Sequence, residues 1–441
     1  MANKEILLFH PRTFHEKNYR NFWIPYSILS LGSELQKKGF DVFLFDNNLE
    51  SIEKNQFPIL LSKFKNLLFV GVSSMIGHQI QEGLLFAQVA KDIFPKAKIV
   101  WGGAAPTMLG HDFINSPLVD IVIKGQGEKT IVELAKALEN KKALNGIRGL
   151  LYKNRKKIIK SSEREILSKD IFALYNYSLI STERYLRKDE HINSRVLNHV
   201  SSQGCPFECG FCSEVSLYHR NWVAESAERI IKEVSVLTKN YNANGIKFYD
   251  ANFFVNKPRV LSFAQKVLDK GWKIRWAASA HPKNLLSFSR KELNVIKKSG
   301  CSRILIGAES GNNEELKYIK KNMTTDDVIR IAEMLEQAGI HGSFTIIVGY
   351  PGFPEDNIKK TLDFGEKITR IGSIHEVKAH VYTPYPGTPL YNKAIQYGFV
   401  PPKTLDEWGN YDYYEVQTPW LKDDLNDIIN QYNKKYCPYV L

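Results

Sequence analysis

Short apolar runs alternate with helical patterns along this 441-residue chain, and this alternation restricts the fold more than any other feature of the sequence. In the first series the apolar runs are EILLFH (5–10), DVFLFD (41–46), NLLFVGVSS (66–74), KIVWGG (98–103) and DIVIKGQGE (120–128). Helical patterns lie between them at 27–39, 80–94 and 129–140. Strands that alternate with helices of this length form parallel sheets covered on both faces. We therefore expect an α/β fold in which residues 1–150 form a doubly wound, Rossmann-like domain.

A second alternating series begins near Arg195 and contains six strand-like runs, at 195–202, 245–251, 273–279, 302–309, 341–349 and 376–383. Six successive β/α units predict a partial (β/α)6 barrel over residues 195–390. Residues 151–194 are rich in Lys, Ser and Tyr with weak periodicity, so we expect a linker with some helix. Residues 391–441 form a short C-terminal extension, aromatic and acidic after Val400, which either covers the active site at the barrel mouth or packs on its outside.

The composition, with 43% hydrophobic and 24% charged residues, is typical of a globular protein. The N-terminus enters an apolar run without the features of a secretory signal, and no stretch approaches the roughly 18 apolar residues that span a bilayer. We therefore expect no membrane span and a cytoplasmic location, where thiols stay reduced. The net charge of +13 permits an anionic partner without identifying one. Because no nucleic-acid-binding motif accompanies the densest basic run, at 153–160, no nucleic-acid partner is expected.

Three of the five cysteines, Cys205, Cys209 and Cys212, lie within eight residues in the pattern C-x-x-x-C-x-x-C, with Phe211 before the last. A disulfide framework is not expected in a reducing compartment, and a structural zinc site normally takes four protein ligands. An iron–sulfur cubane held by three cysteines would leave one iron open to a substrate or cofactor. The motif also follows the first expected barrel strand directly, at the end of the barrel where active sites lie.

This motif, with its aromatic residue and its place after a strand, resembles the signature of the radical S-adenosylmethionine (SAM) enzymes. The resemblance implies that the three cysteines hold a 4Fe–4S cluster, that SAM binds its open iron, and that one-electron reduction by an external flavodoxin- or ferredoxin-like protein gives a 5′-deoxyadenosyl radical. It extends to the ends of the second and fourth expected barrel strands, where Asp250, Asn252, Glu309 and Ser310 resemble SAM contacts. The alternative for Glu309 is to cap the helix that follows.

Three loops at successive strand ends of the first domain are rich in Gly and Ser: SSMIGHQ (73–79), WGGAAPT (101–107) and GQGE (125–128). In a doubly wound sheet the ligand lies outside the carboxyl ends of the strands, and small residues let the backbone approach it. Such a domain ahead of a radical barrel resembles the cobalamin-dependent subclass. The resemblance implies cobalamin contacts from Ser73, Ser74, Met75, Gly77, Gly102, Gly103, Pro106, Thr107, Gly125, Gly127 and Glu128.

The sequence lacks D-x-H-x-x-G, the motif that supplies a histidine to cobalt in classical cobalamin enzymes. His78 is the only histidine in the three loops, and we expect it to serve a polar loop or the core and not to bind cobalt.

Together these resemblances imply a methyltransferase that acts on an unactivated carbon of a small molecule or peptide, with cobalamin as the methyl carrier. A cobalamin-dependent radical enzyme that cyclises or rearranges its substrate is the alternative, and the mass of the product distinguishes the two. A methylthiolating enzyme acting on tRNA is disfavoured, because residues 1–150 contain no cysteine. A non-catalytic cobalamin-binding or light-sensing module would not need the cysteine motif.

Overall fold

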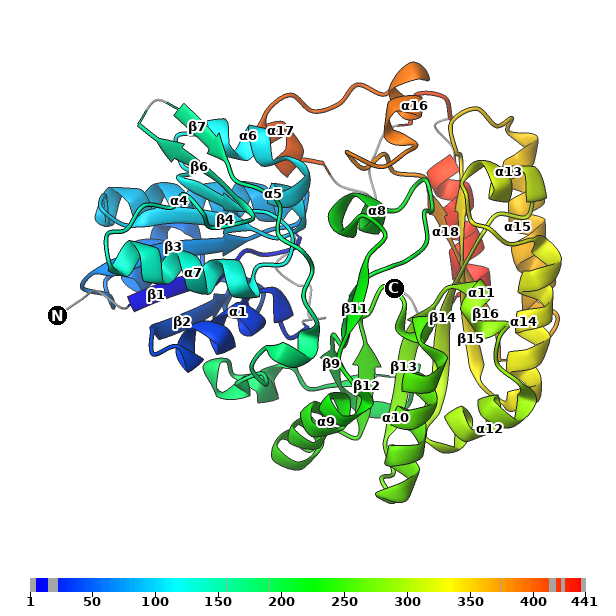
Figure 1. Cartoon of the computed structure of the whole chain (residues 1–441). Helices are drawn as coiled ribbons and strands as arrows, with labels where there is room; N and C mark the ends of the chain where they lie inside the picture. The colour runs from blue at the N-terminus through cyan, green and yellow to red at the C-terminus, as the bar shows by residue number, and fades with distance from the viewer. Residues whose placement is uncertain are drawn as a thin grey trace. The chain divides into compact units, whose positions relative to one another are not determined.

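The structure is a computed structural model that describes residues 5–14, 23–155, 157–189, 191–372, 374–411, 418–421 and 425–437. They form two compact units, one within Met1–Tyr185 and Pro401–Val416, and the other within Leu186–Val400 and Gln417–Leu441. Figure 1 shows that each unit combines a sheet with helices, which confirms the expected α/β class. No helix within the described ranges has both the length and the apolar composition that crossing a bilayer requires.

The first unit is built on a seven-stranded sheet of order β2-β1-β3-β4-β5-β6-β7. The strands are β1 (Glu5–His10), β2 (Asp41–Asp46), β3 (Leu67–Ser73), β4 (Lys98–Gly102), β5 (Ile121–Ile123), β6 (Leu150–Asn154) and β7 (Lys157–Lys160). The first five are parallel, and β6 and β7 add an antiparallel hairpin beside β5. This arrangement confirms the doubly wound domain. The strand order reverses between β1 and β3, and ligands of such sheets bind outside the strand ends at this switch point.

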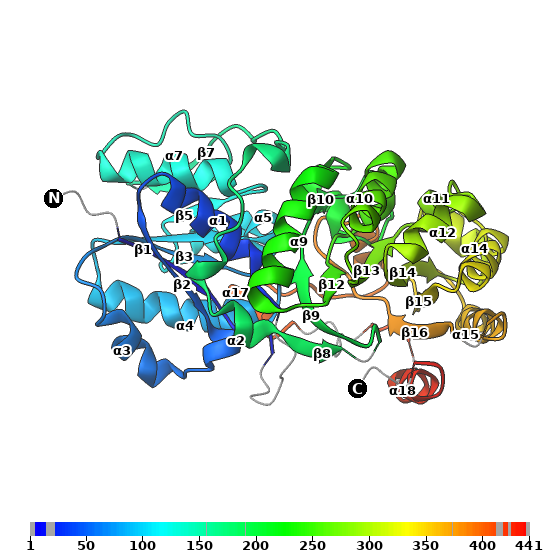
Figure 2. The ribbon, with the colours of Figure 1, turned by 90° about the horizontal axis from the view of Figure 1, so that it is seen from below.

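Helices cover both faces of this sheet (Figure 2). Helices α1 (Tyr26–Lys37) and α7 (Glu128–Glu139) lie on one face, and α3 (Phe57–Leu61) and α4 (His78–Ile93) lie on the other. The shorter helices are α2 (Asn47–Glu50), α5 (Ala104–Met108), α6 (Gly110–Asn115) and α17 (Leu405–Gly409). In the core the Phe9 and Phe86 rings stack with centroids 3.8 Å apart. A Cβ on Gly83 of α4 would lie 2.5 Å from the Trp101 ring, so glycine allows this helix to pack closely.

Residues 151–194, predicted to be a linker with some helix, contain strands and 3-10 turns in the structure. Strands β6 and β7 extend the first sheet, and a chain of 3-10 turns follows: η2 (Lys169–Ile171), η3 (Tyr177–Leu179) and η4 (Thr182–Tyr185). The Tyr185 hydroxyl donates to Asp46 Oδ2 at 2.8 Å, and the Asn176 N–H donates to Ser33 Oγ at 2.9 Å. Strand β7 is the edge strand, and its largely exposed side chains include two lysines, so its sequence lacks the apolar pattern of a central strand, whereas Leu150, Leu151 and Tyr152 of β6 are buried.

The second unit contains a sheet of order β16-β15-β14-β13-β12-β9-β8. Its strands are β8 (Arg187–Asp189), β9 (Ser194–His199), β12 (Gly245–Phe248), β13 (Arg275–Ala280), β14 (Cys301–Glu309), β15 (His341–Val348) and β16 (Glu376–Val381). The six strands of this sheet other than β8 are parallel, and β8 pairs antiparallel to β9. This arrangement confirms the partial (β/α)6 barrel. Its long helices are α9 (Ala227–Tyr241), α10 (Lys257–Asp269), α12 (Arg290–Lys298), α14 (Thr325–Ala338) and α15 (Asp356–Thr369), which follow the strands along one side (Figure 1).

The C-terminal extension divides between the two units. Helix α17 belongs to the first unit, whereas α18 (Leu425–Tyr436) belongs to the second and packs along β16, the edge strand of the barrel sheet. The Asn433 side chain accepts a hydrogen bond from the Ala379 N–H at 2.7 Å and donates one to the Ala379 carbonyl at 3.0 Å. An edge strand has no neighbour for these groups, so α18 satisfies them and protects the edge. Residues 412–417 and 422–424 of the expected cover lie outside the described residues.

We expect the Asn433→Ala substitution to lower the free energy of unfolding of the barrel unit by about 1–3 kcal/mol, because it leaves the Ala379 N–H and carbonyl without partners. Urea-induced unfolding and hydrogen exchange of the Ala379 amide measure this effect. Lys434→Ala, at an exposed position of the same helix, is the matched control and should leave both quantities unchanged. An unaltered exchange rate at Ala379 in the Asn433 variant would contradict the prediction.

Candidate functional site

The cysteine loop is held at its base by a short hairpin that the sequence did not reveal. Strands β10 (Ser202–Gly204) and β11 (Trp222–Ala224) pair antiparallel on either side of the loop and of helix α8 (Ser213–Tyr218). Gly204 has φ +80°, and a Cβ there would lie 2.2 Å from the Asn221 carbonyl oxygen, so the turn into the loop requires glycine. Strands of three residues are too short to leave a periodic pattern in the sequence.

Backbone hydrogen bonds fix the cysteine loop to two other segments of the barrel unit. The Cys212 N–H donates to the Cys209 carbonyl at 3.1 Å. The Gly210 N–H donates to the Ile319 carbonyl at 2.8 Å, and the Gly210 carbonyl accepts from the Leu390 N–H at 2.9 Å. The loop is therefore positioned by the segments that follow β14 and β16.

Cys209 is buried, whereas Cys205 and Cys212 are half-buried. Burial raises the pKa of Cys205 and Cys209, and it raises the pKa of Cys212 to about 12. A thiolate becomes favourable in such a place when a metal offsets its charge. Among the described residues, no three His, Cys, Asp or Glu side chains converge as ligands of a single metal ion. A four-iron cluster offers each thiolate a separate iron, so this loop fits the cluster better than a mononuclear site.

Lys321 is a buried cation beside the cysteine loop, and the sequence analysis did not single it out. Its side chain is 6% exposed, its Nζ lies 2.7 Å from Glu309 Oε1, and it lies 5.8 Å from the centroid of the Phe211 ring. Burial alone lowers the pKa of Lys321, but the Glu309 carboxylate and the thiols of Cys209 and Cys212 outweigh burial and raise it. In the sequence this residue is indistinguishable from the neighbouring exposed lysine, so only the tertiary structure identifies it.

Glu309 ends β14 in a strained conformation that aims its carboxylate at Lys321. It has φ +60°, and the register with β15 shifts between Gly307 and Glu309. A Cβ on Gly307 would lie 2.0 Å from Glu309 Oε1, so the glycine makes room for the ion pair. The next helix, α13 (Asn313–Tyr318), is capped by Asn312, whose side chain accepts from the Glu314 N–H at 2.9 Å. The helix-capping alternative for Glu309 is therefore wrong.

The other predicted SAM residues have different surroundings. Asp250 is buried, and its carboxylate accepts from the Ser201 N–H at 2.7 Å and from the hydroxyls of Ser201 and Ser202, both at 2.6 Å. Both of its oxygens are thus used within the protein, at the connection that leads into the cysteine loop. Ser310 is fully buried, where its hydroxyl donates to Glu315 and accepts from the Asn312 N–H. The structure brings Asp250 and Ser310 near the site but directs their polar atoms to protein partners.

Asn252, by contrast, lies against the cysteine loop itself. Its Nδ2 is 3.9 Å from Cys205 Sγ and donates to Asn284 Oδ1 at 2.9 Å, and its Oδ1 accepts from the His281 N–H at 3.3 Å. The His281 ring stacks on Phe207 of the loop with centroids 3.5 Å apart. Burial, followed by the charge of Lys321, lowers the pKa of His281 to about 2, so the ring is neutral. Neither His281 nor Asn284 belongs to a motif that the sequence could have revealed.

In the first unit, the predicted cobalamin loops are joined to one another at the carboxyl edge of the sheet. The Ser74 N–H donates to the Gly102 carbonyl at 3.0 Å, and the Ser74 carbonyl accepts from the Ala105 N–H at 3.1 Å. Gly103 has φ +100°, and a Cβ there would lie 2.7 Å from the Ser74 oxygen. Thr107 Oγ1 donates to the Gly103 carbonyl at 2.7 Å and accepts from the Gly125 N–H at 3.1 Å. The loops after β3, β4 and β5 therefore form one bonded rim.

The surface of this rim suits a bulky ligand. Met75 leaves 51% of its large apolar side chain exposed, and the buried Ser74 hydroxyl has no hydrogen-bond partner within the described part of the chain. Both features are expected of residues that complete their contacts with a ligand. Pro106 is buried in α5, while Gly127 and the buried Glu128 lie where α7 begins, and His78 is the first residue of α4.

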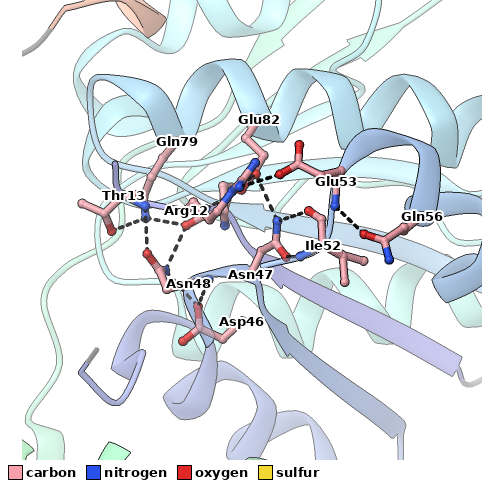
Figure 3. A network of polar contacts seen from close by, with 11 residues as sticks. Arg12, Thr13, Asp46, Asn47, Asn48, Ile52, Glu53, Gln56, Gln79 and Glu82 are labelled. Atoms are coloured by element: carbon pink, nitrogen blue, oxygen red, sulfur yellow. Dashed lines mark hydrogen bonds and ion pairs between the residues drawn. The ribbon is translucent and has the colours of Figure 1, made fainter. Parts of the chain in front are cut away.

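A polar network that the sequence did not predict extends the rim across the switch point (Figure 3). Gln79 Oε1 accepts from the Met75 N–H at 2.8 Å, and its Nε2 donates to the Pro11 carbonyl at 2.9 Å, so it ties the turn after β3 to the segment after β1. Arg12, in that segment, donates from Nε to Glu82 Oε1 at 2.5 Å and from Nη1 to Glu53 Oε1 at 3.0 Å. The network holds the start of the β1–α1 connection on α4.

Two protein-family models match the chain, one in the barrel unit and one in the first unit. Residues 200–365 match the model of the radical SAM superfamily, and residues 17–135 match that of the B12 binding domain. The chain is 28% identical to an uncharacterized methyltransferase of Pyrococcus horikoshii over 84% of this chain and 78% of that protein. It is 22% identical to the anaerobic magnesium-protoporphyrin IX monomethyl ester cyclase of Rubrivivax gelatinosus over 96% of this chain and 74% of that protein.

Among solved structures, the fold is similar to that of TsrM from Kitasatospora setae, a radical SAM methyltransferase whose structure contains cobalamin and a [4Fe–4S] cluster. The TM-score is 0.73 at 15% sequence identity, over 89% of this chain and 75% of that one.

We expect Lys321→Met to make the reduction potential of a cluster on the cysteine loop more negative, on the order of tens of millivolts, because a buried positive charge beside the thiolates favours the added electron. Redox titration monitored by electron paramagnetic resonance measures the potential in samples of equal iron content. The control is Lys320→Met, which removes a neighbouring charge that is 55% exposed and therefore screened by solvent. Equal potentials in the two variants would contradict the prediction.

Proposed function

Because this chain belongs to the cobalamin-dependent radical SAM enzymes, we propose that it transfers a methyl group to an unactivated carbon of a small molecule or a peptide. The cofactors of the family are a 4Fe–4S cluster, SAM and cobalamin. The proposal rests on two features that occur together in this chain. One is the three-cysteine loop at the strand ends of the half-barrel, and the other is the hydrogen-bonded rim of loops at the switch point of the doubly wound sheet.

In this proposal the barrel unit holds the cluster and SAM. Cys205, Cys209 and Cys212 are the iron ligands, and Glu309 accepts hydrogen bonds from the SAM ammonium or ribose hydroxyls. Lys321 holds the Glu309 carboxylate in place through their ion pair until the cofactor arrives. Asn252 orients the Cys205 side of the loop, whereas Asp250 and Ser310 act as positioning residues through their protein partners.

The first unit binds cobalamin through its rim. We assign the contacts to the predicted loop residues, which are Ser73, Ser74, Met75, Gly77, Gly102, Gly103, Pro106, Thr107, Gly125, Gly127 and Glu128. When bound, the cluster supplies the electron that cleaves SAM and cobalamin supplies the methyl group, while the protein positions both and excludes water. An external flavodoxin- or ferredoxin-like protein is proposed as the electron donor, because Cys301 and Cys437 are too few to hold a second cluster.

A small molecule is proposed as the substrate class, because the structure of TsrM has been solved with its substrate tryptophan. A second candidate function is a cyclisation or rearrangement with the same cofactors. The similarity to the Rubrivivax gelatinosus cyclase, which extends over 96% of this chain, favours it. Both reactions use the same two sites, so the product distinguishes them.

We expect a product that carries one methyl group from SAM. The reconstituted protein is incubated with a reductant, hydroxocobalamin, deuteromethyl-labelled SAM and extracts of the host, and new masses are found by mass spectrometry. Methyl transfer adds one labelled methyl in place of one hydrogen, and 5′-deoxyadenosine accumulates with the product. The Cys209→Ala protein is the control and should give neither. A new product without the label, formed only by the intact protein, would favour cyclisation or rearrangement and contradict methyl transfer.

Glu309→Gln should raise the Kd for SAM roughly 10- to 100-fold, because a charged hydrogen bond contributes about 1.5–3 kcal/mol. Iron content and cobalamin binding should remain normal, since neither the cysteines nor the first unit is altered. Isothermal titration with SAM measures the Kd on the folded, reconstituted protein. The control is Glu314→Gln, an exposed carboxylate on α13. Wild-type SAM affinity in the Glu309 variant would show that this carboxylate serves only its ion pair with Lys321.

A further inference from the structure

Helix α17 contacts the turn between β3 and α4, which carries the proposed cobalamin residues Ser73–Gly77. The helix lies more than 200 residues further along the chain, yet the segment Pro401–Val416 belongs to the same compact unit as this turn. It packs directly on α4, and Trp408, near its end, is 3% exposed. The C-terminal extension therefore forms part of the first unit, and this part is separate from the segment that covers β16.

The contact with the turn is made through the backbone. The Gly77 N–H donates to the Trp408 carbonyl at 3.1 Å. Gly77 is the residue before α4, where backbone N–H groups have no partner within the helix and commonly take one from elsewhere. Its φ is +104°, and a Cβ there would lie 3.0 Å from the Tyr411 carbonyl oxygen. Both the hydrogen bond and the close approach depend on α17 being in place.

Helix α17 is itself held against the first turn of α4. A Cβ on Gly409 would lie 2.4 Å from Gln81 Cγ and 3.2 Å from the Gln81 backbone nitrogen, so the two helices touch where glycine leaves space. The Gln81 side chain donates to Asn410 Oδ1 at 2.5 Å. Because these contacts involve side chains, substitutions can disturb them without altering any residue of the turn.

The turn is thus fixed from three directions. Ser74 joins it to the turn after β4, Gln79 joins it to the segment after β1, and Trp408 joins it to α17. The first two partners come from the first 185 residues, and the third comes from beyond the barrel. A binding loop that is already held in its bound shape does not lose binding free energy to ordering.

We propose that α17 is a positioning element of the cobalamin site, through the bond between the Trp408 carbonyl and the Gly77 N–H. The proposal rests on the proposed role of Ser73–Gly77 in binding cobalamin. It gives this part of the extension a function in the first unit.

The test uses full-length variants with a reconstituted cluster, titrated with hydroxocobalamin and followed by the visible spectrum. Gly409→Ala and Trp408→Ala should raise the Kd for cobalamin about tenfold, the factor that corresponds to the loss of one hydrogen bond from the turn. Iron content and SAM affinity should remain at wild-type values. The matched controls are Gly110→Ala, where a Cβ finds ordinary contacts of 3.5 Å or more, and Trp420→Ala, whose indole N–H donates to Gly349 in the barrel unit.

Unchanged cobalamin affinity in the folded Gly409 and Trp408 variants would overturn the proposal. Urea-induced unfolding of the apoproteins measures the unfolded fraction of each variant. If the Kd for cobalamin rose only in proportion to this unfolded fraction, the substitutions would act on stability alone, and this result would also overturn the proposal. Gly409→Ala retains every side chain of α17, so it remains informative if Trp408→Ala does not fold. If the wild-type protein bound no cobalamin, the proposed function itself would fail, and this result is distinct from all of the others.

Discussion

The geometry of the barrel site depends on the hydrogen bonds that the buried carboxylate of Asp250 accepts. This carboxylate receives hydrogen bonds from Ser201, which precedes the hairpin that carries the cysteine loop, and from Ser202, the first residue of that hairpin. Arg259 donates to Ser201 Oγ and to the carbonyls of Glu225 and Phe253 from the other side. A buried carboxylate is costly unless it is paired and fully hydrogen-bonded, as it is here. These hydrogen bonds therefore fix the position of the loop before any cofactor binds.

A buried charge pair, Glu309 with Lys321, lies beside the same loop. Replacing such a pair by apolar residues often leaves stability unchanged or increases it, so stability alone does not explain its presence. Its surroundings do: the lysine lies beside two thiols that are proposed as iron ligands, and Glu309 is held in a left-handed conformation that a strand end does not need. The Asp250 hydrogen bonds position the start of the cysteine loop, and the Glu309–Lys321 pair places a charge beside it.

The sequence predicted those parts of the structure whose signal is local. Strands β1 and β2 have the predicted bounds, because their apolar runs are bounded by turn residues, and the six barrel strands were located for the same reason. The hairpins β6–β7 and β10–β11 were missed, since strands of three to five residues are too short to leave a periodic pattern in the sequence. Lys321 and Gln79 were missed because their roles depend on residues brought together by the fold. Asp250 follows β12 as predicted, but its carboxylate accepts hydrogen bonds from serines of the same unit, and its contact with SAM stays a prediction.

The path of the chain through the first unit has a consequence for its biosynthesis. A ribosome releases the parallel sheet early, whereas α17 emerges only after the whole barrel has been translated. Domains near the N-terminus usually fold as soon as they are complete, but this one cannot make its contact between Gly77 and Trp408 until the segment beyond the barrel has been translated. The nascent domain therefore first folds without the helix that closes the turn after β3, and its last contact forms only after the barrel has been synthesised.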